Sequence, residues 1–312
     1  MTLTQLNAFV LVARLGSVRA AARALGVSEP AVSQALNALR QHLGDRLLER
    51  GPSGMTMTTG GSRLLTVATQ MVALGAEAEA AVRDARGGAE QLRLVAPSPI
   101  AEFVATPLLD AFARRYRMPL ESSSGVANGA EMAVLVANRL ADLALGPYLG
   151  AVPGLALVSE PVLRCRMVVV GPGRAARPTR GPWLVDPSGT DPSSDTGRLL
   201  TRLGVCEDQI RVYPNQTAAW AAVADGAGLS AAPGHLIGPR VRRGELKIVE
   251  TRATPMEVHW HATTLPRDTR PPSVAALRRF LDTPEATHLL RAPGTGVPPS
   301  HFKPPVYVTI WR

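Results

Sequence analysis

The amino-acid sequence predicts a small N-terminal domain with a winged helix-turn-helix, then one long linker helix, then a larger α/β domain. Residues 3–43 carry apolar side chains at helical spacing, interrupted by tight turns that contain glycine. Residues 59–86 repeat small or apolar side chains alternately every four and three positions, which is typical of a helix that packs along its length. From residue 92 onward, short apolar runs alternate with helical stretches. A chain of 312 residues also exceeds the usual length of one domain.

The composition is that of an ordinary globular protein with a basic surplus. Hydrophobic residues make up 46% of the chain and charged residues 19%, which does not indicate disorder. The 34 basic and 25 acidic residues give a formal charge of +9, which favours an acidic partner such as a nucleic acid, although solubility alone would also explain it. Two cysteines are too few for a secreted disulfide framework, and neither a leader peptide nor an apolar membrane-spanning run is recognised. We therefore expect a cytoplasmic protein without membrane contact.

The helix-turn-helix is predicted from local start and stop signals. Ser17 precedes an Ala-rich helix that stops at Gly26, and Ser28 with Pro30 begins the next helix. Apolar residues on the second helix form a core stripe, and the opposite face is polar enough to meet base edges in a major groove. The stripe consists of Val32, Leu36, Leu39 and Leu43, and the polar face of Glu29, Ser33, Gln34, Asn37, Arg40 and Gln41.

Two short strand-like runs at 47–50 and 55–58, joined by Gly51-Pro52-Ser53-Gly54, predict the hairpin that forms the wing. The linker helix follows over residues 59–87, and its seam favours pairing with a second copy of the chain. An alternative is that the helix packs on its own domain. The residues assigned to dimerisation are Leu64, Ala68, Met71 and Val82.

The C-terminal part is predicted to hold a mainly parallel sheet covered by helices. Strands are expected at 92–96, 143–145, 167–170, 184–185 and 229–231, and helices at 106–116, 129–139, 196–203 and 217–226. The tail over 291–312 is rich in proline and glycine, and residues 306–311 are typical of one added strand.

The N-terminal region resembles the LysR-type transcriptional regulators over about 60 residues. The residues that carry the resemblance are Leu6, Phe9, Gly16-Ser17, Ala21-Ala22, Leu25, Val27-Ser28, Pro30-Ala31, Val32-Ser33, Leu39, Leu43-Gly44, Leu47, Glu49-Arg50, Thr58 and Gly61. A looser resemblance to the family's effector domain extends over residues 91–290, through Leu92-Ser98, Asp142-Gly146, Glu160-Val170 and Asp225-Pro233.

The resemblance implies a division into a DNA-binding domain (1–58), a linker helix (59–87) and an effector domain (88–290) with the type 2 periplasmic-binding-protein fold. The effector domain would have one lobe over about 91–161 and 265–290 and another over about 162–264, with a ligand cleft between them. The implied partners are double-stranded DNA, a small-molecule effector, RNA polymerase, and further copies of the chain in a homodimer or homotetramer. Glu29 stands where the family most often has Gln, and Arg40 replaces a typical Glu, so the preferred base sequence is expected to differ.

Residues of the DNA-binding domain divide into phosphate contacts and base contacts. Hydroxyl, amide and guanidinium donors suit phosphates, whereas the exposed polar start of the second helix suits base edges. The phosphate set is Ser17, Arg19, Ser28, Gln34, Arg50 and Thr58, and the base-reading set is Glu29, Ser33 and Asn37, next to Pro30. The alternatives are that the hydroxyls only cap helices and that the polar face is merely solvated.

By resemblance, the effector cleft is lined by loops at the starts of several helices. Such starts present free backbone amides and favour a small anion such as a carboxylate. The residues assigned to the cleft are Ser98, Pro99, Ile100, Asn128, Gly146, Ser188, Thr190 and Thr217. The alternative is that these residues only cap helices.

Enzymatic and metal-dependent classes find little support. The sequence has no GxSxG, HExxH, Walker A or GxGxxG motif, and no cofactor is expected. His259 and His261 would lie on the same side of a strand, but no third ligand stands nearby, so no metal site is predicted. Cys165 and Cys206 leave a thiol redox sensor as the alternative function, and a solute carrier is disfavoured by the attached DNA-binding domain.

Overall fold

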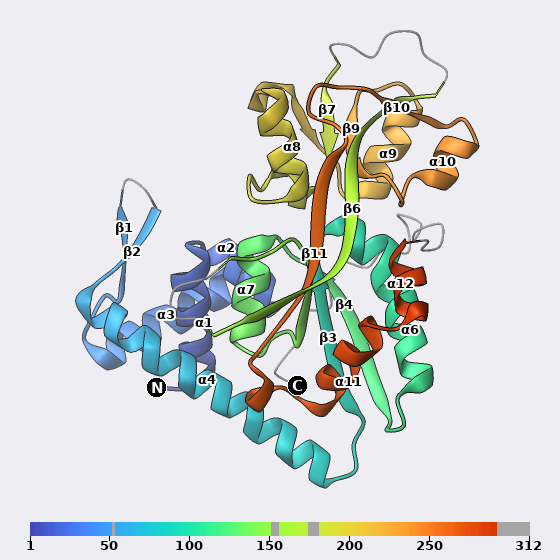
Figure 1. Cartoon of the computed structure of the whole chain (residues 1–312). Coiled ribbons are helices and arrows are strands. Elements are labelled where there is room, and N and C mark those ends of the chain that lie inside the picture. Colours follow the sequence, from blue (N-terminus) through green and yellow to red (C-terminus); the bar gives the residue numbers. More distant parts are fainter. Residues whose placement is uncertain (52–53, 151–155, 174–180, 292–312) are drawn as a thin grey trace.

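The computed structural model describes residues 1–51, 54–150, 156–173 and 181–291. A helical head is joined by the long helix α4 to a two-lobed α/β domain (Figure 1). The head comprises α1 (Leu3–Leu15), α2 (Val18–Leu25), α3 (Glu29–Leu43), β1 (Leu48–Gly51) and β2 (Gly54–Met57), and α4 covers Thr59–Ala85. The strand expected at 306–311 lies outside the described residues. None of the described helices is long and apolar enough to cross a membrane.

The head folds around α1, which is buried from Leu6 to Val12 because α2, α3 and α4 all pack against it. The predicted caps are confirmed: the Ser17 hydroxyl accepts a hydrogen bond from the Ala20 amide at 3.3 Å, and the Ser28 hydroxyl accepts one from the Ala31 amide at 3.4 Å. Glycine ends each of the first three helices in the left-handed conformation, as at Gly26 with φ 65°.

The start of α4 lies directly against the loop that precedes the wing. The Thr58 hydroxyl accepts from the Gly61 amide at 2.9 Å and donates to the Asp45 carboxylate at 2.8 Å. A Cβ at Gly60 would lie 2.0 Å from Asp45 Oδ2, and one at Gly61 would lie 2.1 Å from the Leu47 carbonyl oxygen. The glycine pair therefore permits a contact that no larger residue allows.

The predicted linker seam is divided between two environments. Ala68 is fully buried against the head, and Leu64 and Met71 pack on the same core cluster. Val82 is 55% exposed. Two further apolar side chains on the outer side of the helix are also exposed, Val67 to 51% and Leu74 to 62%. The first half of the seam thus packs on its own domain, which was the alternative expectation.

The effector domain contains one seven-stranded sheet in the order β10-β6-β11-β5-β3-β4, with β9 also paired to β6. Its strands are β3 (Glu90–Ala96), β4 (Leu120–Val126), β5 (Leu143–Gly146), β6 (Val158–Pro172), β9 (Ser230–Pro233), β10 (Leu246–Val249) and β11 (Met256–Thr264). A separate parallel pair is formed by β7 (Trp183–Val185) and β8 (Ile210–Val212). Helical segments cover these sheets: α5 (Ser98–Ile100), η1 (Ala101–Ala105), α6 (Thr106–Arg115), α7 (Gly129–Ala137), η2 (Pro187–Thr190), α8 (Asp195–Leu203), η3 (Glu207–Gln209), α9 (Gln216–Ala224), α10 (Gly238–Arg242), η4 (Arg267–Thr269), α11 (Pro272–Leu281) and α12 (Pro284–Arg291).

The expectation of a mainly parallel sheet is wrong for the described strands. Only β3 pairs in parallel within the large sheet, with β4 and β5, whereas β11 and β6 run antiparallel through both lobes. The physical reason is the double crossing, because the chain enters the second lobe along β6 and returns along β11 (Figure 1). We call the part with β3, β4, α6, α7 and α11 lobe I, and the part with β7, β9, α8 and α9 lobe II.

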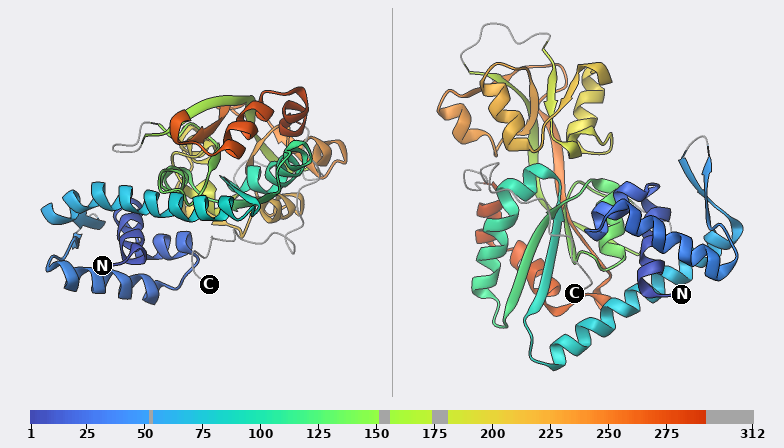
Figure 2. Two further views of the ribbon diagram at one scale, coloured as in Figure 1. Left: turned by 90° about the horizontal axis from the view of Figure 1, so that it is seen from below. Right: turned by 180° about the vertical axis from the view of Figure 1, so that it is seen from behind.

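The head lies against lobe I rather than apart from it, as both views in Figure 2 show for the helices next to α7. Met132 and Leu135 on α7 belong to the same core cluster as the head residues. An ion pair joins Arg23 on α2 to Glu131 on α7, and another joins Glu77 on α4 to Arg139 of lobe I. Head, linker and lobe I are therefore packed together.

Candidate nucleic-acid interface and effector cleft

The recognition face of α3 is open to solvent in the described structure. Glu29, Pro30, Gln34 and Asn37 are exposed and Ser33 is half-buried, so the residues assigned to base edges share one accessible helix face. This face begins at the capped helix start, which is the part of a recognition helix that commonly reaches bases.

Arg40 has a structural position that the sequence did not reveal. Its guanidinium donates to the Arg46 carbonyl at 2.7 Å, to the Leu48 carbonyl at 3.1 Å and to Asn37 Oδ1 at 3.3 Å. Arg40 therefore ties α3 to the base of the wing and orients Asn37 on the recognition face.

The residues assigned to phosphates surround this face. Arg19 on α2 is exposed, and Ser17, Ser28 and Thr58 use their hydroxyls as helix caps. Arg50 lies in β1 of the wing, in register with Met55 of β2. The Ser17 and Ser28 hydroxyls act as acceptors in their caps and keep a hydrogen for a phosphate, whereas the Thr58 hydroxyl already donates its hydrogen to Asp45.

A small cavity of about 30 Å³ lies between the lobes. It has room for about one water molecule. Of the residues predicted there, Pro99, Ile100 and Ser188 line this cavity, while Ser98, Asn128, Gly146, Thr190 and Thr217 do not. Sequence reasoning missed Ser194, Asp195, Thr196 and Trp260, which line it. Ser194 caps the start of α8, and this capping signal in the sequence could have indicated Ser194, Asp195 and Thr196 as residues of a helix start beside the cleft.

Ser98 and Thr217 come together on a carboxylate that the sequence analysis did not identify. Glu102 is 1% exposed and lies in η1 of lobe I. Its Oε1 accepts from the Ser98 hydroxyl at 2.5 Å and from the Gln216 amide at 2.7 Å. Its Oε2 accepts from the Thr217 amide at 2.8 Å and from the Thr217 hydroxyl at 2.5 Å.

The start of α7 has a similar arrangement. Asn128 caps the helix locally by accepting from the Glu131 amide at 2.9 Å, while the Gly129 amide donates to Asp191 of lobe II at 3.2 Å. The predicted anion-binding helix starts of α7 and α9 are therefore both occupied by carboxylates of this chain. Gly146 instead serves close packing, since a Cβ there would lie 2.9 Å from Pro97.

A second buried carboxyl, Asp186, stands beside this site. Burial raises its pKa to about 6, hydrogen bonds from Ser188 oppose the shift, and the charge of Glu102 adds to it. In the amide orientation that satisfies both of its ends, Gln216 donates to Asp186 at 2.9 Å and accepts from the Trp220 indole at 2.7 Å. Asp186 thus carries a proton in the folded protein at mildly acidic pH.

The cysteines do not form a reactive pair in this structure. Burial raises the pKa of the Cys165 thiol to about 12, with a further contribution from the charge of Asp195, and Cys206 is an exposed free thiol. A thiol with that pKa is almost entirely protonated at neutral pH and reacts slowly.

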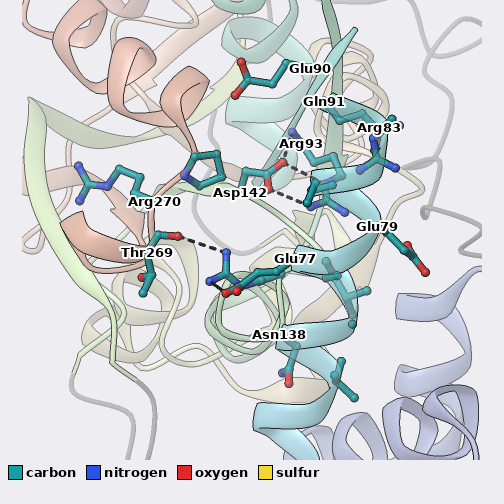
Figure 3. A pocket seen from close by; sticks show the side chains of 18 of the residues that line it. Glu77, Glu79, Arg83, Glu90, Gln91, Arg93, Asn138, Asp142, Thr269 and Arg270 are labelled. Atoms are coloured by element: carbon teal, nitrogen blue, oxygen red, sulfur yellow. Dashed lines mark hydrogen bonds and ion pairs between the residues drawn. The ribbon is translucent and has the colours of Figure 1, made fainter. Parts of the chain in front are cut away.

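A larger cavity of about 610 Å³ lies where α4 passes lobe I. Two pairs of charged side chains meet in it: Arg93 binds Asp142 with two hydrogen bonds of 2.9 Å, and Arg139 contacts Glu77 as well as the Thr269 carbonyl (Figure 3). Asn138 lines the cavity, and its Oδ1 atom is buried without a hydrogen-bond partner among the described residues. This cavity is formed by segments far apart in the chain and was not predicted.

Comparison with known proteins assigns both parts of the chain. The family model described as the bacterial regulatory helix-turn-helix protein, lysR family, matches residues 3–62, and the LysR substrate binding domain matches residues 85–283. An uncharacterized HTH-type transcriptional regulator of Mycobacterium tuberculosis, Rv0377, is 31% identical over 100% of both chains. The HTH-type transcriptional regulator CfxR of Cupriavidus necator is 29% identical over 90% of this chain and 91% of its own.

Solved structures share the fold. A full-length AphB variant aligns with TM-score 0.56 at 18% identity, and CbnR, a LysR family transcriptional regulator, aligns with TM-score 0.51 at 21% identity. Each alignment covers 90% of this chain and 98% of the other chain. The chain belongs to the LysR family of DNA-binding transcriptional regulators that carry an effector-binding domain.

Proposed function

We propose that this regulator reads its operator with the exposed start of α3 and responds in the cytoplasm to a small molecule bound between lobes I and II. The observation that carries the proposal is the accessible polar face of α3, with Ser33, Asn37 and Glu29 beside capped helix ends that suit phosphate contacts. Glu29 accepts rather than donates hydrogen bonds, so it favours cytosine at the base it meets.

The division of labour is tested with purified full-length protein on the operator and on an unrelated duplex. Asn37→Ala and Ser33→Ala should cost roughly 1–3 kcal/mol on the operator and little on the unrelated duplex, because base contacts carry sequence information. Arg50→Ala should weaken both duplexes about equally and reduce the dependence of affinity on salt concentration. Glu121→Ala, an exposed change on β4 of lobe I and outside the head, is the control. Equal losses for all variants on both duplexes would refute the assignment.

The effector site is supported by the cavity between the lobes and by the family match of this domain. Because the cavity holds about 30 Å³, a ligand of ordinary size enters only when the lobes separate. Titration of the full chain with candidate metabolites, with and without an Ile100→Trp change that fills the cavity, tests this location.

Self-association is expected through the outer side of α4. Val67 and Leu74 lie seven residues apart and are 51% and 62% exposed, so they offer an apolar stripe to a second copy, continued by Val82. Leu74→Glu should shift the protein towards monomer in sedimentation velocity, whereas Glu79→Gln, an exposed change on the same helix, should not. We also propose that the chain assembles into a homodimer or homotetramer and that it contacts RNA polymerase.

A further inference from the structure

Glu102 is a buried carboxylate whose hydrogen-bond donors among the described residues are all neutral, and the positive charge of Arg240 acts on it from outside this set. Two backbone amides at the start of α9 and two hydroxyls contact its two oxygens at 2.5 to 2.8 Å. The free amides of a helix start together with hydroxyl donors form a typical anion-binding arrangement. Glu102 therefore has the surroundings that a bound carboxylate ligand would have.

The contact joins the two lobes, since Glu102 belongs to lobe I and α9 to lobe II. A second carboxylate makes the reverse contact, because Asp191 of lobe II accepts from Gly129 at the start of α7 in lobe I. Each lobe thus supplies a carboxylate to a helix start of the other. A cavity of about 30 Å³ also lies between the lobes.

The local caps leave these positions open for a second partner. Asn215 accepts from the Ala218 amide at 2.8 Å, so the Gln216 and Thr217 amides still need acceptors. Glu102 satisfies both. Without its carboxylate, these two amides and the Ser98 and Thr217 hydroxyls would face a small, empty anion site.

We propose that Glu102 is a tethered carboxylate ligand: it occupies the anion site of the cleft, holds the lobes closed, and excludes free carboxylates from that site. This inference rests on the proposed function in one respect, namely that the cleft between the lobes is the effector site. Because a side chain of the protein already fills this anion site, the effector of the wild-type protein would have to be recognised by other parts of the cleft.

Acetate is the natural probe, because Glu102→Ala removes a CH₂–COO⁻ group that acetate replaces almost atom for atom. Full-length wild-type protein, Glu102→Ala and the exposed control Glu121→Ala are titrated at pH 7.5 with sodium acetate, with sodium chloride or acetamide in parallel, and thermal unfolding and heats of binding are measured. If acetate binds with a dissociation constant of about 10 mM, 100 mM acetate raises the folding equilibrium constant of Glu102→Ala about tenfold. Wild type and Glu121→Ala should respond to acetate no more than to chloride.

Two outcomes overturn the proposal: saturable acetate binding by wild type equal to that of Glu102→Ala, or a folded Glu102→Ala that ignores acetate. If Glu102→Ala does not fold with or without acetate, Glu102→Gln decides. Its amide nitrogen cannot accept hydrogen bonds, so amide hydrogen exchange at Gln216 or Thr217 should quicken about tenfold while Ala218, capped by Asn215, stays unchanged. Unchanged exchange at all three amides would show that Glu102 does not hold this helix start.

Neither readout involves DNA or a natural effector. If the wild-type protein did not bind its operator, the proposed function would be contradicted, but the acetate result would be unaffected. A failed acetate experiment would leave operator recognition by α3 intact.

Discussion

Helix starts in the DNA-binding head and helix starts beside the cleft satisfy their free amides in different ways. In the head, Ser17 and Ser28 accept from amides three residues ahead of them. At the cleft, Glu102 accepts from amides 114 and 115 residues away, and Asp191 accepts from one 62 residues away. The head uses local capping alone at these two helices, whereas the cleft adds capping across the lobes to the local caps of Asn128 and Asn215.

This difference has a mechanical consequence. Local caps persist in any arrangement of the domains, so the recognition helix keeps its start whether or not the rest of the molecule moves. The hydrogen bonds that Glu102 and Asp191 accept from the other lobe exist only while the lobes are together, so separating the lobes breaks them. With the proposed effector site between the lobes, the coupling between ligand binding and lobe motion would concentrate at the starts of α7 and α9.

The largest effect should come from removing the cross-lobe carboxylate. Glu102→Ala leaves two amides and two hydroxyls of a buried region without acceptors, and we expect the free energy of unfolding to fall by roughly 3–5 kcal/mol. Asn215→Ala at the same helix start removes only a local cap and should cost about 1 kcal/mol. Urea unfolding of both variants in chloride buffer measures the two free energies of unfolding. Equal losses for Glu102→Ala and Asn215→Ala would contradict the greater importance of the cross-lobe contact.

A smaller effect is expected from the pH dependence that Asp186 contributes. Because the pKa of the folded state, about 6, lies above the unfolded value of 3.8, the folded state binds the proton more tightly. The contribution to stability is present below pH 3.8 and is lost as the pH rises through 6, by at most about 3 kcal/mol. Asp186→Asn cannot titrate, so its stability relative to wild type should increase between pH 4 and pH 7.

Urea unfolding of wild type, Asp186→Asn and the exposed control Glu121→Gln over this pH range measures the difference. A constant difference between wild type and Asp186→Asn would contradict the raised pKa. Glu121→Gln should show no comparable rise, because its carboxylate is exposed.

The head was predictable because its signals are local. Ser17, Gly26, Ser28 and Gly44 each mark a helix end within a few residues of itself, and the structure places the ends there. The sequence determined less about which side of the linker helix is buried. Positions 64, 68 and 71 have the same spacing as positions 67, 71 and 74. Only the packing of α4 on α1 shows which of the two sets is covered.

The cleft was not predictable in the same way. Strand directions depend on β6 and β11, whose paired residues lie 89 to 106 positions apart, and no local pattern records such pairing. Glu102 offered one signal, a single carboxylate in an otherwise apolar run from Ile100 to Val104, which indicates either an exposed side chain or a buried one with a distant partner. Choosing between these required the position of α9.

The smallest expected effect concerns Ser28, where the local cap and the proposed phosphate contact are separable. Ser28→Ala removes the acceptor for the Ala31 amide and should lower the free energy of unfolding by about 1 kcal/mol. Ser28→Asp keeps a capping acceptor but places a negative charge where a phosphate would approach, so it should preserve stability and weaken binding to any duplex, most strongly at low salt. Thermal unfolding and fluorescence anisotropy on the two variants measure the two quantities separately. If Ser28→Asp binds DNA as tightly as wild type, Ser28 is a cap alone, and the head then resembles the cleft in using its helix starts only to hold the fold.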